Sequence, residues 1–144
     1  MPGPRAYRSD KESPLAHAEG SAAAMHRTDP PRTVELGTPD GRWIAVCDAR
    51  ELELEPDTGT AVLLPGGDQA AVFRTASGEL LAVGNRDPFA DAWVIADGIT
   101  GSVDGAPTVS SPLHKRLFDL RTGTCLDDPS RALPVWPVRL HPVD

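Results

Sequence analysis

From Arg42 onward the sequence consists of short apolar runs closed by turn-forming residues, and this rhythm constrains the fold more than any other feature. The runs are RWIAVCD, TAVLLP, QAAVFRT and ELLAVGN, and the last three are separated by GGD and ASG. Runs of this length that are rich in β-branched residues predict strands. Glycine adopts the positive φ of tight reversals, so the separators predict hairpin turns and an antiparallel meander.

The rest of the chain continues in the same way. GSV and TVSS flank a turn at residues 104–107, and RLFDL precedes the turn Arg-Thr-Gly at residues 121–123. ALPVWPVRL predicts one last strand, which its two prolines confine to an edge or a bulge. No helical stripe is present, although ARELELE suits one short turn. The pattern predicts an all-β fold, an antiparallel sandwich or small barrel of short strands.

Residues 1–38 do not show this pattern of short apolar runs and turns. Pro, Ala, Ser, Gly and charged residues dominate them, and no apolar period is visible. We therefore expect a disordered N-terminal arm over residues 1–38 and a single β domain over residues 39–144. Met25 is an alternative start, because nothing upstream of it requires folding, and a tail without function is the simplest interpretation.

Charge and hydropathy limit the possible partners and compartments. No apolar run is long enough to span a bilayer, and the first 20 residues lack the apolar stretch of a secretory signal. We expect a cytoplasmic protein with no membrane partner. Residues 1–33 carry a net charge of +1 and residues 34–144 one of −8, which together give the −7 of the chain. An acidic domain lacks the clustered cations that nucleic acid requires. Cys47 and Cys125 are predicted to be reduced thiols.

Two stretches are patterned like metal-binding loops. SSPLHKRLFDLRTG combines a proline-bearing turn, a histidine, an aromatic strand and a closing turn, and GNRDPFADAWVIADG supplies an earlier loop after a predicted strand. Together they resemble the two loops of Rieske-type domains, which hold a [2Fe–2S] cluster on Cys-x-His and Cys-x-x-His. The resemblance implies a Rieske-like β fold with two long loops at the former cluster site.

Three of the four ligand positions that this resemblance implies carry other residues. Asn85 and Ser111 stand at the cysteine positions, and Asp87 stands at the first histidine position. Only His114 remains. Amide and hydroxyl groups cannot supply the thiolates that the cluster needs, so we expect neither a cluster nor any other metal in this chain. The two cysteines lie outside both loops and are not expected to replace the missing ligands.

The whole pattern resembles the small subunit of assimilatory NAD(P)H-dependent nitrite reductase, a Rieske-like domain without the cluster. The resemblance covers about residues 42–140 and also includes the closing LPVWPVRL. It implies a partner, the large subunit, which carries FAD, sirohaem and a [4Fe–4S] centre and reduces nitrite to ammonium with NAD(P)H. This chain is then an accessory subunit in nitrite assimilation that docks rather than carries electrons, and no cofactor is expected in the chain itself.

The former ligand positions are expected to be structural. Asn85, Asp87 and Ser111 would satisfy loop amides that otherwise face a cluster, with Asp87 pairing with His114 or Lys115 across the loops. A lone histidine without a second ligand or a substrate pocket is predicted to be neither a metal site nor a catalyst. We therefore expect no catalytic residue in this chain.

The loop tips carry basic and aromatic residues, the types that dominate interface hot spots. We interpret five of them as a partner-binding surface: Arg86, Phe89, Trp93, Lys115 and Arg116. Arg121 adds a further cation close by in the sequence. The alternative that Phe89 and Trp93 fill the core beneath the loops stays open. Trp43 and Trp136 lie in strand patterns and are predicted to be core residues.

Two alternative functions remain. One is a Rieske-type [2Fe–2S] ferredoxin that carries electrons, and the other is a free-standing β-domain binding module. A nucleotide site is not expected, because the glycine-rich stretches lack the Gly-x-Gly-x-x-Gly spacing before a helix. A nucleophile elbow is also missing from the sequence.

Overall fold

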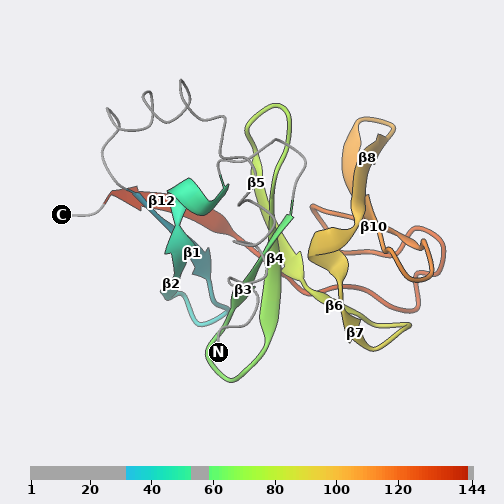
Figure 1. The fold of residues 1–144 in the computed structure, drawn as a ribbon, viewed down its shortest axis with the longest axis horizontal. Coiled ribbons are helices and arrows are strands. Elements are labelled where there is room, and N and C mark those ends of the chain that lie inside the picture. The colour runs from blue at the N-terminus through green and yellow to red at the C-terminus, as the bar shows by residue number, and fades with distance from the viewer. Residues whose placement is uncertain (1–31, 53–58, 143–144) are drawn as a thin grey trace, which may run out of the picture.

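The computed structural model of the chain describes residues 32–52 and 59–142, and in them it is an all-β protein, as predicted. Its strands form antiparallel sheets of order β12-β1-β2, β11-β5-β4-β3 and β10-β9-β8, with a short β6–β7 ribbon (Figure 1). The strands are β1 (Arg32–Gly37), β2 (Trp43–Asp48), β3 (Gly59–Leu63), β4 (Gln69–Arg74), β5 (Leu80–Gly84), β6 (Arg86–Asp87), β7 (Ala92–Trp93), β8 (Ile99–Val103), β9 (Ala106–Ser110), β10 (Leu117–Asp119), β11 (Val135–Trp136) and β12 (Val138–Pro142). Two short 3-10 helices, η2 (Ala49–Leu52) and η3 (Ile95–Asp97), complete the set. Neither has the length or the apolar character needed to cross a membrane.

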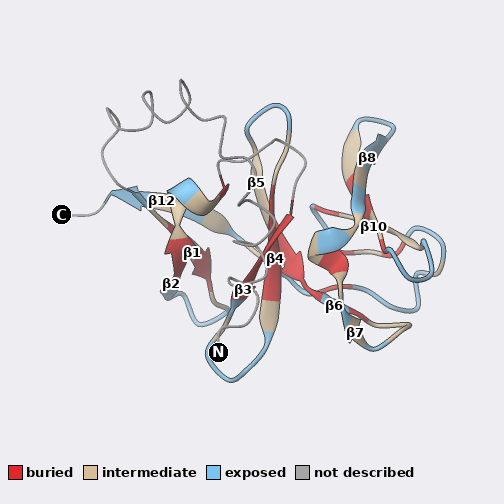
Figure 2. Cartoon of the chain, in the orientation of Figure 1, coloured by how far each residue is buried: buried red, intermediate tan, exposed pale blue. Residues whose placement is uncertain are grey.

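The β11-β5-β4-β3 sheet lies in the middle and is covered on both faces (Figures 1 and 2). Side chains alternate between the two faces of a strand, so Ala70 and Val72 of β4 pack into one apolar cluster while Ala71 and Phe73 pack into the other. All four are buried. Burial on both faces explains why these strands read as continuous apolar runs instead of alternating ones.

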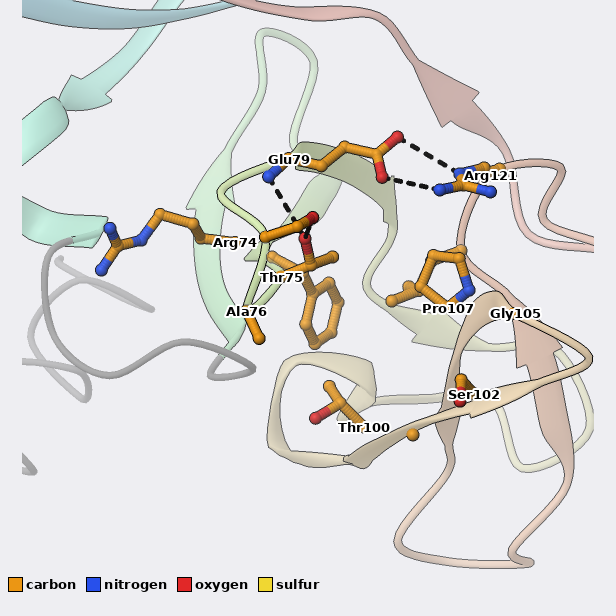
Figure 3. Close-up of a pocket in the computed structure, with 13 residues that line it drawn as sticks. Arg74, Thr75, Ala76, Glu79, Thr100, Ser102, Gly105, Pro107 and Arg121 are labelled. Carbon is orange, nitrogen blue, oxygen red and sulfur yellow. Dashed lines mark hydrogen bonds and ion pairs between the residues drawn. The ribbon is translucent and has the colours of Figure 1, made fainter.

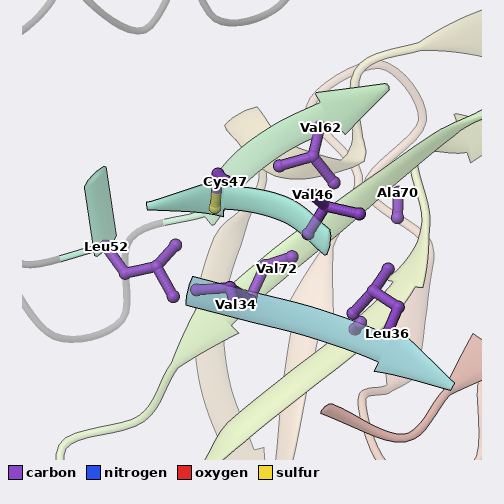
Figure 4. Packing of buried hydrophobic residues seen from close by; sticks show 9 residues of the cluster. Val34, Leu36, Val46, Cys47, Leu52, Val62, Ala70 and Val72 are labelled. Atoms are coloured by element: carbon purple, nitrogen blue, oxygen red, sulfur yellow. The ribbon is translucent and has the colours of Figure 1, made fainter. Parts of the chain in front are cut away.

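The first apolar cluster joins the central sheet to the β12-β1-β2 sheet. Val34 and Leu36 of β1 are fully buried there against the central strands (Figure 4). Cys47 lies in the same cluster as a free, buried thiol. Leu52, at the end of η2, closes the cluster, so the short turn predicted for ARELELE is confirmed.

The second apolar cluster joins the other face of the central sheet to the β10-β9-β8 sheet. Phe73 meets Val109 and Phe118 there, and Cys125 is again a free, buried thiol. The hairpin between β8 and β9 turns through Asp104 and Gly105, both at positive φ (51° and 83°), as a tight two-residue reversal requires. This sheet positions one of the two loops of the candidate site.

Two boundaries differ from the sequence predictions. Arg32–Gly37 was placed in the disordered arm but forms β1, the central strand of its sheet, because Val34 and Leu36 complete the first cluster. The domain therefore includes residues 32–38, and the remainder of the predicted arm lies outside the described residues. ALPVWPVRL is not one strand: it divides at Pro137 into β11, which pairs with β5, and β12, which pairs with β1.

The tryptophan predictions are partly wrong. Trp43 is 38% exposed, and the guanidinium of Arg139 lies 4.2 Å from the centroid of its ring. Trp136 is half-buried and packs against the first cluster. The predicted meander of β3, β4 and β5 is confirmed, with continuous antiparallel pairing across all three strands.

Candidate functional site

Two loops meet at one end of the domain and contain every residue singled out for the candidate site except Arg121. Loop A (residues 85–98) follows β5 and includes the β6–β7 ribbon and η3. Loop B (residues 111–116) connects β9 to β10. Loop B is closed by two main-chain hydrogen bonds: Ser111 N donates to Arg116 O at 2.9 Å, and Lys115 N donates to Ser111 O at 2.9 Å.

A buried hydrogen bond ties the two loops together. The hydroxyl of Ser111 donates to Oδ2 of Asp87 at 2.5 Å, and both residues are inaccessible to solvent. Oδ1 of the same carboxylate accepts from the amides of Phe89, at 2.8 Å, and Ala90, at 3.2 Å. Asp87 therefore both shapes the turn of loop A and anchors loop B. Ser111, instead of His114 or Lys115, is the residue that bonds Asp87 across the loops.

These bonds set the ionisation of Asp87. Burial by itself raises the pKa of the carboxyl group, because it penalises the charged form. The hydrogen bonds from Ser111, Phe89 and Ala90, with a further Coulombic contribution from His114, outweigh burial and lower the pKa below the ordinary value of 3.8. Asp87 is thus a buried carboxylate held in its charged form by donors from both loops.

Asn85 performs a similar task at the base of loop A. It is buried, its Nδ2 donates to Oε1 of Gln69 at 2.9 Å, and its Oδ1 accepts from the amide of Ala96 at 2.7 Å. Its own amide donates to Gln69 O at 2.9 Å, and its carbonyl accepts from Ile95 N at 3.1 Å. The side chain therefore fastens η3 to the start of β4.

The aromatic ring of Phe89 is half-buried and supports two arginines. It packs against the second apolar cluster, with its centroid 6.3 Å from that of Phe118. The guanidinium carbon of Arg116 lies 3.9 Å from the ring centroid of Phe89, and that of Arg131 lies 5.5 Å from it. Arg131 also donates from Nη1 to the carbonyl of Pro88 at 3.1 Å. Phe89 thus packs on the core, as the alternative interpretation expects, and contacts two arginines of the same chain at the surface. Its part in partner binding stays a prediction.

Comparisons with known proteins agree with this geometry. A family model described as a Rieske-like [2Fe–2S] domain matches residues 42–143. The NADH nitrite reductase small subunit of Salmonella typhimurium (strain LT2) is 36% identical over 88 residues, which cover 60% of this chain and 79% of that protein. A crystal structure from Mycobacterium tuberculosis, assigned as an NADH-dependent nitrite reductase small subunit, shares 41% identity with a TM-score of 0.57 and covers 63% of this chain and 88% of that one. The chain belongs to the Rieske-like nitrite reductase small-subunit family.

A further relative of this chain is a large subunit. The nitrite reductase [NAD(P)H] large subunit of Klebsiella oxytoca is 32% identical over 107 residues. The match covers 74% of this chain but only 11% of that protein. In that relative, a stretch similar to this chain is therefore part of a much longer polypeptide.

The residues at the ligand positions do not fit a [2Fe–2S] cluster. No thiolate is available in either loop, and the polar groups of Asn85, Asp87 and Ser111 are already engaged in hydrogen bonds. His114 is exposed at the tip of loop B. Within the part of the chain that the structure describes, no group of three or more His, Cys, Asp or Glu side chains is placed to hold a metal.

The surface residues predicted to bind a partner differ in their exposure and in the contacts that they make within the chain. Arg86 is exposed but faces Asp91, with Nη1 and Oδ1 2.7 Å apart, and Trp93 is 42% exposed. Lys115 is exposed, whereas Arg116 is half-buried on Phe89. Sequence reasoning missed Arg131, which lies far along the chain from both loops. The only sequence feature that could have pointed to Arg131 is its position next to a turn, and arginines in such positions are common on protein surfaces.

Arg121 belongs to a different surface. Its guanidinium makes two hydrogen bonds to Glu79, at 2.8 and 3.2 Å, beside a hollow of about 360 Å³ between the β4–β5 turn and the β8–β9 hairpin (Figure 3). These bonds lower the pKa of Glu79 and raise that of Arg121. Thr75, Thr100 and Ser102 line the hollow, but none of the loop residues discussed above does.

Proposed function

We propose that this chain is the accessory subunit of a cytoplasmic NAD(P)H nitrite reductase and that it acts by docking to the large subunit. The observation that carries this proposal is the hydrogen bond between Ser111 and Asp87. It joins the two loops at positions where, in a Rieske-type domain, a cluster would join them. A rigid pair of loops without a redox centre suits recognition, not electron transfer. The large subunit would supply FAD, sirohaem and the [4Fe–4S] centre.

The Klebsiella relative supports a physical association. A large-subunit polypeptide that contains a stretch similar to this chain keeps the two parts at a high effective concentration. A separate small subunit must reach the same arrangement through a binding surface. We assign that surface to the exposed tips of loops A and B, where Arg86, Phe89, Trp93, Lys115 and Arg116 lie.

Nitrite turnover by the large subunit, measured with and without this chain, tests the proposal. We expect the chain to co-purify with the large subunit and to increase turnover or the lifetime of the active complex. The double variant Arg86→Ala/Lys115→Ala should weaken the association, and undiminished co-purification of this variant would contradict docking through the loops.

A Rieske-type electron carrier is the competing function. It requires iron and labile sulfide in this chain and predicts that electrons from NAD(P)H reach the chain during turnover. The donor set of the loops argues against it, because nothing in either loop can provide a thiolate. A free-standing binding module predicts that no association with a nitrite reductase large subunit occurs at all.

A further inference from the structure

Most arginines in the described residues are neutralised by a carboxylate of the same chain. Each of five arginine side chains has a carboxylate oxygen between 2.7 and 3.5 Å away. The pairs are Arg42–Asp40, Arg50–Asp48, Arg86–Asp91, Arg121–Glu79 and Arg139–Glu35. A cation that is already paired offers less to a charged partner, because its own carboxylate competes for it.

Three cations differ from this pattern: the two arginines over the Phe89 ring, and a lysine that precedes one of them in loop B. Lys115, Arg116 and Arg131 have no ion-pair partner among residues 32–52 and 59–142. Two acids that follow β10 accept hydrogen bonds from other groups: Asp127 accepts from the amide of Leu117, and Asp128 accepts from the amide and hydroxyl of Ser130. The bonds from Ser130, together with the positive charge of Arg116 and Arg131, lower the pKa of Asp128.

The Phe89 ring orients these guanidinium groups in advance. The guanidinium carbon of Arg116 lies 3.9 Å from the ring centroid, and that of Arg131 lies 5.5 Å from it, where the hydrogen bond to Pro88 O holds it. A guanidinium that stacks on an aromatic face keeps its in-plane N–H groups free to make paired hydrogen bonds to a carboxylate. Since the ring rests on Phe118, the platform is part of the core and does not need to form on binding.

Lys115 occupies a backbone conformation that does not favour lysine. Its φ is +56°, in the left-handed region. Asp91 and Asp104, the other non-glycine residues with positive φ in the described chain, have short polar side chains that tolerate this region. Lysine has no such compensation, so the loop holds an ammonium group at a strained position. This observation is independent of the arginine platform and points to the same surface.

We propose that Lys115, Arg116 and Arg131 form the principal contact of this chain with the large subunit and that the surface they meet carries carboxylates. The inference rests on the docking function proposed above. It deepens that function by naming the chemistry of the partner surface and by adding Arg131 to the residues that contact it. The whole chain carries a net charge of −7, so the rest of its surface repels an acidic partner surface. This repulsion orients the partner toward the three cations.

The test is the dissociation constant of the complex between the full-length chain and the purified large subunit. It is measured at roughly 50 and 300 mM salt, where surface electrostatics are weakly and strongly screened. The variants are Lys115→Asn, Arg116→Gln and Arg131→Gln, with Arg42→Gln and Arg50→Gln as controls in which a paired arginine outside the two loops is replaced. Residue 115 is exposed, and asparagine suits its positive φ better than lysine does. The Lys115→Asn variant is therefore expected to fold even if an arginine variant does not.

We expect each of the three variants to weaken binding by about three- to tenfold at low salt and to reduce its salt dependence. The two controls should change the dissociation constant by less than about twofold, and Lys115→Arg, which keeps the charge, should bind like the wild type. If the wild-type chain binds and Lys115→Asn and Arg116→Gln bind equally well, this inference is wrong although docking stands. If the wild-type chain does not bind, the docking function itself is wrong, and this inference with it.

Discussion

Ser111 Oγ donates a 2.5 Å hydrogen bond to Asp87 Oδ2, and this contact joins two loops whose residues lie 24 positions apart in the chain. Both side chains are buried, and the distance is typical of a hydroxyl bonded to a charged carboxylate. In a Rieske-type centre, a cluster would join the two loops at these positions. Here a carboxylate and its hydroxyl donor connect the same two segments.

Replacing Ser111 with alanine should destabilise the domain. The buried Asp87 carboxylate would lose one of its three donors, and a hydrogen bond to a charged group contributes about 1.5–3 kcal/mol to the free energy of unfolding. Urea unfolding of Ser111→Ala, with the exposed Ser102→Ala as the matched control, measures this loss. A value within error of the control would show that the bond contributes nothing to stability.

Acid should weaken the domain through Asp87. Its pKa in the folded chain lies below 3.8, so the unfolded chain binds this proton at a higher pH than the folded chain does. The stabilisation is therefore complete above about pH 5 and is lost as the pH falls through the unfolded value and then through the lower folded one. Unfolding free energies measured between about pH 2 and 6 should fall less steeply for Asp87→Asn than for the wild type.

The comparison with Asp87→Asn is needed because other carboxylates also make the folded chain less stable as the pH falls. Asp40, Asp48, Glu79 and Asp128 also have lowered pKa values, and they are present in both proteins. Parallel pH profiles for the wild type and Asp87→Asn would mean that the folded chain does not favour the charged form of Asp87.

Gly123 should tolerate no side chain. Its φ is +80°, and a Cβ there would lie 2.1 Å from the carbonyl oxygen of Leu133. Gly67 also has a positive φ, but no atom lies within 4 Å of its hypothetical Cβ. We expect Gly67→Ala to cost about 1 kcal/mol of stability and Gly123→Ala at least about 3 kcal/mol. Equal losses in thermal unfolding would show that the segment carrying Leu133 can move away.

Thr60→Val should stabilise the domain. Thr60 lies in β3, is 1% exposed, and its hydroxyl has no hydrogen-bond partner among the described residues. A buried hydroxyl without a partner carries a desolvation penalty, so its removal in a side chain of the same shape should add about 1 kcal/mol. Thr60→Ser, which keeps the hydroxyl and loses the methyl group, is the control and should be less stable than the wild type. A destabilised Thr60→Val would indicate a partner for the hydroxyl.

Local patterns were sufficient to predict most of the fold. The three strands of the meander follow from apolar runs and glycine turns, and both features depend only on neighbouring residues. β1 was missed because only Val34 and Leu36 mark its inward face, and its pairing with β12 is determined by a segment at the other end of the chain. The two strands within ALPVWPVRL were predicted as one, since nothing local shows that they belong to different sheets.

The sequence pattern locates the two loops of the candidate site, but it does not predict which side chains contact one another there. The loop motifs locate Asn85, Asp87 and Ser111, yet the residue that bonds Asp87 is chosen by how the two loops fold against each other. Arg131 joins the Phe89 platform from a distant segment, and no spacing in the sequence connects the two. Contacts between distant segments are what a sequence pattern does not specify.

The iron and acid-labile sulfide content of the untagged protein, purified and then treated anaerobically with iron and sulfide, tests the central claim most directly. Because hydrogen-bonded amide, carboxylate and hydroxyl groups stand where thiolates and an imidazole are required, we predict negligible bound iron and no visible absorbance. Stoichiometric iron and sulfide with the absorbance of a [2Fe–2S] centre would contradict the account and favour an electron carrier.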